Sequence, residues 1–346
     1  MQIMTLMDGL FSTLAGFIQK FASIILAMLV SSGSFAAPPT DDPIKAVNPD
    51  EVQLTFNVSG DSQVNGFNYN RVYLDLTLQD INNAETEQDA FVIVGDITEN
   101  CLTSEWDMVN EILGKYNYGK ELIFATGNHD IRLRDYSESL GRFTASYNTI
   151  TGEELDSMSY TKEINGYTFI VMGSDEEVME EAYISDAQLE WLDESLAAAT
   201  ADGKPVFVIL HQPLKDTHGL PIPWGNGTNK NAGHVGEQSE AIQAILDEYK
   251  NVILISGHLH LGFGQYTYEK VGNFHAVNVP AIGKGNADNI VEKLGLDAGF
   301  AADAGGVVHD HRGKHHAHRK LDGIKALSGI SFAAVEIQIA GCAASA

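Results

Sequence analysis

Apolar and polar positions along the chain divide it into short strands and amphipathic helices. Residues 52–58 alternate between apolar and polar side chains, which predicts a strand. Residues 90–94 and 205–210 are continuous apolar runs, the pattern of strands that are buried on both faces. Helical patterns lie at 69–83 and 103–116. This alternation of strands and helices predicts a layered α/β fold whose central strands are mostly parallel.

The second half of the chain continues the pattern less regularly. Residues 159–162 and 168–172 read as an antiparallel pair around the turn Asn165-Gly166. Further helices are predicted at 186–199 and 237–249, and further strands at 121–126, 251–256, 266–268, 276–279 and 331–339. Residues 284–327 are rich in Gly, Ala and Asp, and we interpret them as an irregular segment.

The N-terminal residues have the order of a secretory signal. Lys20 precedes the uncharged apolar run 21–30, and the small residues Ser34 and Ala36 follow as a cleavage site. The run is shorter than the roughly 20 residues that span a bilayer, unless residues 10–18 extend it. Signal peptide and N-terminal membrane anchor therefore both stay open, and we expect a secreted, periplasmic or cell-surface protein.

These patterns give an expected domain organisation. The predicted parts are a leader at 1–36, a Pro-rich linker at 37–50, a catalytic-type domain at 51–283, the irregular segment at 284–327 and a final strand and tail at 328–346.

Charge and cysteine content exclude several classes of function. The 346 residues carry 47 acidic and 21 basic side chains, which gives a formal net charge of −26. Such a field repels nucleic-acid polymers and anionic membranes. A small phosphorylated substrate stays compatible with it, because a bound metal ion inverts the local field. Cys101 and Cys342 lack the neighbours of a redox or zinc motif, so no cysteine chemistry is inferred, although a pairing between them stays open.

Candidate chemistry follows the ends of the strands. Five predicted strands, ending at residues 58, 94, 125, 210 and 255, are each followed closely by a potential metal ligand. These ligands are Asp61, Gln63, Asp96, Asn128, His211, His258 and His260. Each one alone is compatible with an ordinary turn or a histidine at the edge of the core. In open α/β sheets, however, sites lie outside the carboxyl ends of the strands, so together they predict one metal site.

The ligand types restrict the metal. Carboxylate, amide and imidazole donors without a thiolate suit Mn, Fe, Zn or Mg. Seven donors exceed the need of one ion, so two divalent ions are implied, with Asp96 able to bridge them. Two ions roughly 4 Å apart hold the attacking and leaving oxygens of a displacement at phosphorus and lower the pKa of a shared water.

The same residues carry a family resemblance. The motifs Asp61-x-Gln63, Gly95-Asp96-x-x-Glu99, Gly127-Asn128-His129-Asp130, His211 and Gly257-His258-x-His260 resemble those of the calcineurin-like metallophosphoesterases, in the family's order. The resemblance covers about residues 52–283. It implies a four-layer α/β/β/α sandwich of two mixed sheets and a dinuclear metal centre.

The resemblance also implies a role for each residue. Asp61, Gln63 and His260 would join the bridging Asp96 around one ion, and Asn128, His211 and His258 would join Asp96 around the other. His129 would contact the phosphoryl oxygen or protonate the leaving group, Glu99 would orient it, and Asp130 would support the loop. The family commonly has histidine where this chain has Gln63, and the neutral amide is the weaker ligand.

The expected function is therefore metal-dependent hydrolysis of a phosphoric ester. A non-catalytic extracellular binding protein that retains the fold is the alternative, motivated by Gln63 and by the irregular segment. Monoester, diester, nucleotide, pyrophosphate and phospholipid substrates all stay open.

Several other side chains have uncertain roles. His218, His234 and His275 are interpreted as solvated loop histidines, with a place in the substrate pocket as the alternative. Trp224 either covers a substrate or packs against its own loop. The histidines between 309 and 318 are interpreted as part of a loop, with weak metal binding as the alternative.

Overall fold

The computed structural model describes residues 50, 52–67, 69–84, 87–218, 233–260 and 267–282, and the backbone of strands at 316–321, 324–329 and 335–340. The predicted leader lies outside these residues. Within them, no helix is long and apolar enough to cross a membrane.

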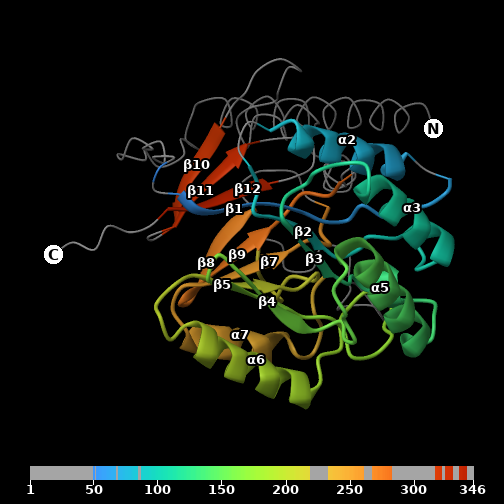
Figure 1. Cartoon of the computed structure of the whole chain (residues 1–346). Coiled ribbons are helices and arrows are strands. Elements are labelled where there is room, and N and C mark those ends of the chain that lie inside the picture. Colours follow the sequence, from blue (N-terminus) through green and yellow to red (C-terminus); the bar gives the residue numbers. More distant parts are fainter. Residues whose placement is uncertain are drawn as a thin grey trace, which may run out of the picture. The chain divides into compact units, whose positions relative to one another are not determined.

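Two mixed sheets form the centre of the fold (Figure 1). The first has the order β12(Val335–Ala340), β1(Val52–Ser59), β2(Ala90–Val94) and β3(Glu121–Ala125). The second has the order β4(Tyr160–Ile164), β5(Tyr167–Val171), β6(Val206–Ile209), β7(Val252–Ser256), β9(Phe274–Asn278) and β8(Tyr268–Val271). Central neighbours run parallel, whereas β12, β4 and β8 are antiparallel to their partners. The prediction of an α/β fold with two mixed sheets is confirmed.

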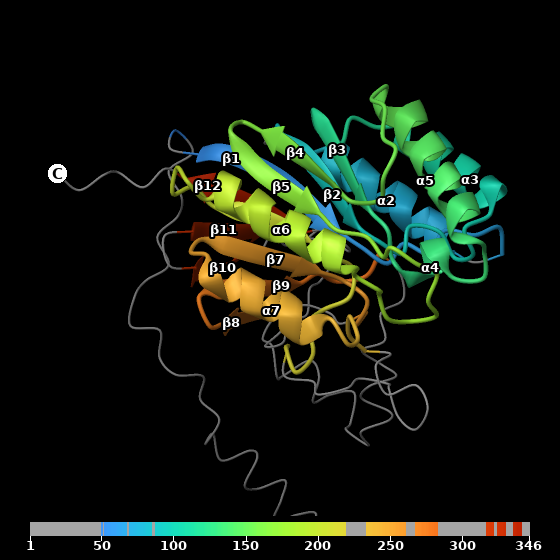
Figure 2. The ribbon, with the colours of Figure 1, turned by 90° about the horizontal axis from the view of Figure 1, so that it is seen from below.

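Helices cover the outer face of each sheet (Figure 2). The first sheet packs against α2(Asn70–Asn82), α3(Thr103–Leu113) and α5(Tyr136–Thr151), and the short α4(Asn128–Ile131) lies just before α5. The second packs against α6(Asp186–Ala199) and α7(Ser239–Glu248). The layers are therefore helix, sheet, sheet and helix.

The two sheets face each other across an apolar core. Phe56 of β1, Phe169 of β5 and Phe207 of β6 meet there, with ring centroids 4.8–5.1 Å apart. The intervening residues of the strands, such as Phe91 and Ile93 of β2, point the other way and pack with the helices. Because both faces of the central strands are buried, one against the other sheet and one against the helices, these strands are continuous apolar runs.

Several predicted elements differ from the structure. α5 was not predicted, because its buried face includes the polar residues Ser139 and Ser146, which blur the helical pattern. β10(His316–Leu321) lies within the segment interpreted as irregular, and β11(Ile324–Gly329) begins in it; the two form an antiparallel pair, and β11 lies beside β12. The interpretation is wrong for these two strands, because their backbone pairing leaves no signature in a Gly- and His-rich composition.

Candidate metal centre

The loops that follow five strands meet at one edge of the two sheets. Backbone hydrogen bonds tie these loops together: Asp61 donates to Gly95 over 3.0 Å, Gln63 donates to Asp96 over 2.8 Å, and Gly257 donates to His211 over 2.9 Å. Every potential ligand that the sequence predicted lies on one of these loops. The parallel strands deliver them there because their carboxyl ends share an edge.

Five of the site residues have left-handed backbone conformations. The φ angles are 54° at Asp61, 41° at Gln63, 49° at Asp96, 68° at His258 and 50° at His260. For a residue with a side chain, this conformation costs roughly 1–2 kcal/mol. Such strained residues cluster where the surrounding structure fixes a functional side chain.

Asp61, Asp96 and His260 form one group whose potential ligand atoms all lie within 4.8 Å of one another. His260 Nε2 is 3.0 Å from Asp61 Oδ1. The Gln63 amide nitrogen lies 3.5 Å from Asp96 Oδ2, so this side chain borders the same group.

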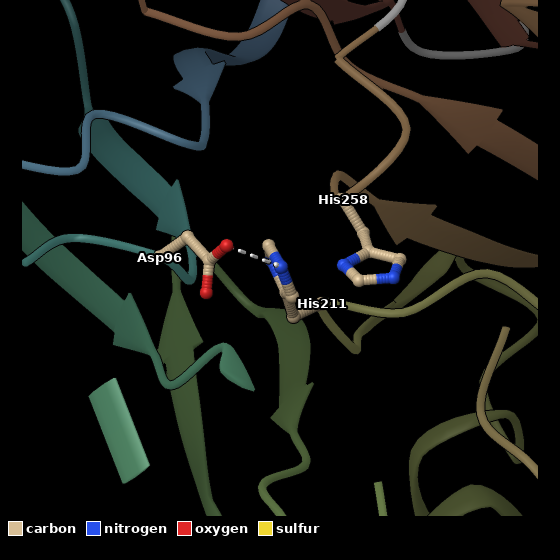
Figure 3. Close-up of side chains that lie close together, drawn as sticks. All are labelled: Asp96, His211 and His258. Atoms are coloured by element: carbon tan, nitrogen blue, oxygen red, sulfur yellow. Dashed lines mark ion pairs between the residues drawn. The ribbon is translucent and has the colours of Figure 1, made fainter. Parts of the chain in front are cut away.

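Asp96, His211 and His258 form a second group of the same kind (Figure 3). His211 Nε2 is 3.3 Å from Asp96 Oδ2, and the rings of His211 and His258 meet edge to face with centroids 5.1 Å apart. Asp96 belongs to both groups, so one carboxylate connects them.

The residues present fit divalent ions. Within the described part of the chain, Asn128 Oδ1 and His211 Nε2 are buried and lack a hydrogen-bond partner. His211 Nδ1 is 2.6 Å from the Val94 carbonyl oxygen, a contact that fixes the ring and leaves Nε2 to face the site. Hard oxygen and imidazole donors without sulfur suit the ions expected from the sequence.

Glycines let the carboxylates approach the neighbouring loops. A Cβ on Gly127 would lie 2.2 Å from Asp96 Oδ1, and a Cβ on Gly257 would lie 2.6 Å from Asp61 Oδ2. Any other residue at these positions would displace a carboxylate of the site.

Protons on the imidazoles balance the buried carboxylates. Burial would raise the pKa of Asp96, but His211, His129 and His258 outweigh it and hold this pKa well below its usual range. Burial lowers the pKa of His211, whereas Asp96 and Asp61 raise it to about 9. Burial lowers the pKa of His260 as well, but the charge of Asp61 outweighs burial and raises this pKa above its usual value. A divalent cation can replace these protons, because it supplies the same positive charge.

His129 lies at the rim of the site, with its side chain 12% exposed. Its Nδ1 is 2.8 Å from the main-chain oxygen of Glu99 and 3.4 Å from Glu99 Oε1, so the carbonyl is the nearer of the two partners. Its Nε2 is 2.9 Å from the Gln63 amide nitrogen and 3.9 Å from Asp96 Oδ2. Burial lowers the pKa of His129, but Asp96 and Glu99 raise it to about 9.

Asp130 connects two of the loops. Its buried carboxylate accepts hydrogen bonds from the backbone N–H groups of Gly127, Ile97 and Thr98 and from the Thr98 hydroxyl. The loop after β2 is thereby fixed to the loop after β3, which places Asp96 against Gly127 and the backbone N–H of His129.

The sequence reasoning missed Arg132, Glu180 and Gln212. Arg132 Nη1 is 2.9 Å from Glu180 Oε1, and Arg132 Nη2 is 2.9 Å from His129 Nδ1. Gln212 donates to the main-chain oxygen of Glu180 over 3.2 Å. Gln212 follows His211 directly, which was the one available signal.

The interpretation of His218, His234 and His275 as solvated is wrong, because all three are buried. His234 Nδ1 accepts from the Gly236 N–H, and His275 Nδ1 is 2.8 Å from the Tyr268 hydroxyl. None of the three belongs to either ligand group found among the described residues. Cys101 is free and buried. Trp224, Cys342 and the histidines at 309, 311 and 315 lie outside the described residues.

Comparison with known proteins decides the family. The sequence profile of the calcineurin-like phosphoesterases matches residues 54–262. The chain belongs to this family. Phosphoester hydrolysis is thus the activity that its family and its ligand groups support.

The chain is also similar to one curated protein and to one solved structure. A probable glycerophosphodiester phosphodiesterase, GpdQ, from Arcobacter nitrofigilis is 26% identical over 199 residues, which cover 56% of this chain and 65% of that relative, just under two thirds of its length. The crystal structure of a dimetal phosphatase from Danio rerio has a TM-score of 0.52 at 14% identity, over 84% of this chain and 99% of that chain. The second likeness shows the fold alone.

Proposed function

We propose that this phosphoesterase hydrolyses a phosphoric ester at a dinuclear metal centre. The observation that carries the proposal is the position of Asp96, which is common to two ligand groups of buried carboxylates and imidazoles. A carboxylate has two oxygens and can serve two ions at once, and among the described residues no other side chain lies in both groups.

The chain's own residues divide the work. One ion would be held by Asp96 together with Asp61, Gln63 and His260. The other ion would be held by Asp96 together with Asn128, His211 and His258. Two such ions, when bound, bind the phosphoryl oxygens and lower the pKa of the attacking water. The metal would be Mn, Fe, Zn or Mg.

His129 would assist the leaving group. Its Nδ1 faces the Glu99 carbonyl and its Nε2 faces the site. The Gln63 amide nitrogen, which can only donate, lies 2.9 Å from Nε2, so this contact must open before a proton on Nε2 can pass to the departing oxygen. Gln63 contacts Nε2 and borders Asp96, and it therefore positions this ring as well as offering its amide oxygen to an ion.

The substrate class and the location are part of the proposal. A small soluble phosphodiester is favoured over a polymer, because the chain's net charge of −26 repels polyanions and the relative named above is a probable diesterase. The apolar run and cleavage-site residues of 1–36 support export to a secreted, periplasmic or cell-surface location.

Metal reconstitution tests the function. The chelated protein is loaded with Mn²⁺ or Zn²⁺, bound metal is counted, and hydrolysis of aryl phosphate mono- and diesters is measured. We expect two ions per chain and diester turnover. Asp96→Asn should lower turnover at least on the order of 10³-fold, or about 4 kcal/mol. His129→Ala should lower it roughly 10²–10⁴-fold with both ions retained.

Circular dichroism of each variant provides the control for folding. Full turnover by Asp96→Asn, or a wild-type protein that binds two ions and hydrolyses no phosphoester, would contradict the proposal.

A further inference from the structure

The amide of Asn128 is held by its nitrogen end. Asn128 Nδ2 donates to Glu180 Oε2 over 3.1 Å and to the main-chain oxygen of Met179 over 3.4 Å. Its other end, Oδ1, is buried without a hydrogen-bond partner in the described part of the chain. An amide has one donor end and one acceptor end, so these contacts select one of its two orientations.

Glu180 is well suited to make this selection. An ionised carboxylate only accepts hydrogen bonds, so it attracts the amide nitrogen and repels the amide oxygen. With the nitrogen bound to Glu180, the oxygen is the end left to bind a cation. Rotation of the amide by half a turn would break this hydrogen bond and bring two oxygens together.

Glu180 is itself fixed from two sides. Its second oxygen, Oε1, is 2.9 Å from Arg132 Nη1, and its main-chain oxygen accepts from Gln212 over 3.2 Å. Arg132 also approaches His129, with Nη2 2.9 Å from Nδ1. The segment between β5 and α6 is thereby joined to the loops after β3 and β6, which belong to different sheets.

We infer that Glu180, supported by Arg132, is a positioning residue that turns the Asn128 oxygen toward the second ion. The inference rests on the proposed function, because it takes Asn128 as a ligand. Groups that orient a ligand typically contribute roughly 10–100-fold to metal affinity.

A general electrostatic effect is the competing explanation, since any nearby carboxylate attracts cations. Glu177 lies on the same segment and carries the same charge, but it is exposed. No hydrogen bond or ion pair from its side chain to Asn128 is present among the described residues. Glu177→Ala is therefore the matched control for Glu180→Ala.

Calorimetric titration with Mn²⁺ tests the inference without any activity measurement. We expect Glu180→Ala to weaken one of the two binding events roughly 10–100-fold and Glu177→Ala to change neither by more than about threefold. In an Asn128→Ala background, Glu180→Ala should have no further effect, because the residue through which it acts is gone.

Equal losses in Glu180→Ala and Glu177→Ala, or a full additional loss in the Asn128→Ala background, would overturn the inference. If Glu180→Ala fails to fold, Glu180→Met carries the test: it keeps the length of the side chain but cannot accept the hydrogen bond from Asn128 Nδ2, and an affinity equal to that of the wild type would overturn the inference. A wild-type protein that binds fewer than two ions would instead contradict the proposed function, so the two failures are distinguishable.

Discussion

The two sheets contribute different chemistry to the site. The loops of the first sheet supply oxygen donors, from Asp61, Gln63, Asp96 and Asn128, whereas the loops of the second supply only imidazoles, from His211, His258 and His260. Among the ligands, negative charge therefore comes from the first sheet and imidazoles come from the second. The contacts of His260 with Asp61 and of His211 with Asp96 join the two halves. Neither sheet alone therefore supplies a complete set of ligands, and the site forms only when the two sheets pack together.

Removing one side chain from each half tests this division most strongly. Asp61→Asn removes a buried charge that also accepts from the His258 N–H over 3.0 Å, so we expect turnover to fall at least on the order of 10³-fold, or about 4 kcal/mol. His260→Gln replaces one neutral donor by another and leaves the charge of the site unchanged, so we expect a loss smaller by about tenfold, or ~1.4 kcal/mol. Metal content and steady-state kinetics measure both.

If His260→Gln were as damaging as Asp61→Asn, the proposed division of roles between the sheets would be wrong. Matching circular dichroism spectra would be needed to attribute either loss to the site.

The core between the sheets provides the next test. Phe207→Ala removes a ring that stacks on Phe169 at 4.8 Å, and the cavity should lower the free energy of unfolding by about 3–4 kcal/mol. Phe143→Ala, in the outer helical layer, is the matched control because its ring is equally buried. We expect similar losses of stability in urea titrations, but weaker metal binding only for Phe207→Ala.

Equal metal affinities for the two phenylalanine variants would show that the packing between the sheets does not set the geometry of the site.

The pH dependence of metal binding tests the imidazole half of the site. The pKa of His211 is raised to about 9 in the ion-free protein by Asp96 and Asp61. Because it lies above the usual value, protonation stabilises the ion-free fold fully below pH 6.5, and this contribution is lost as the pH rises through about 9. Metal affinity should therefore rise from pH 6.5 to 9, by about tenfold per pH unit for each proton displaced.

Calorimetry in buffers of different ionisation enthalpy counts the released protons. An affinity that stays constant over this interval would show that no histidine proton competes with the ion.

Local signals explain which elements the sequence predicted. α6 has the predicted bounds, and Ser185 caps it by accepting from the Gln188 N–H. The β4–β5 hairpin follows from Asn165 and Gly166, which have φ angles of 52° and 75°. The ligands could be predicted because each one follows an apolar strand closely. Strand ends of a parallel sheet lie at the same edge, so the position of a residue after a strand predicts that it lies in the site.

The remaining features depend on contacts without a local pattern. Glu180 meets Arg132 across 48 positions of sequence, and nothing near either residue marks the pair. The carbonyl of Glu99, rather than its carboxylate, lies nearest to His129, and a main-chain contact leaves no trace in the residue type. α5 and the β10–β11 pair were missed because their residues lack a clear apolar period.

The pairing of β1 with β12 has a consequence for how the chain folds. Phe56 lies opposite Ile337, so the first described strand obtains one of its two neighbours from the last. Contacts between such distant residues slow folding, because the intervening chain must first be ordered. During synthesis, β1 would therefore wait with an open edge until residues 335–340 leave the ribosome. An exposed edge of this kind can pair with another chain, so the interval before β12 forms is the one in which β1 is open to aggregation.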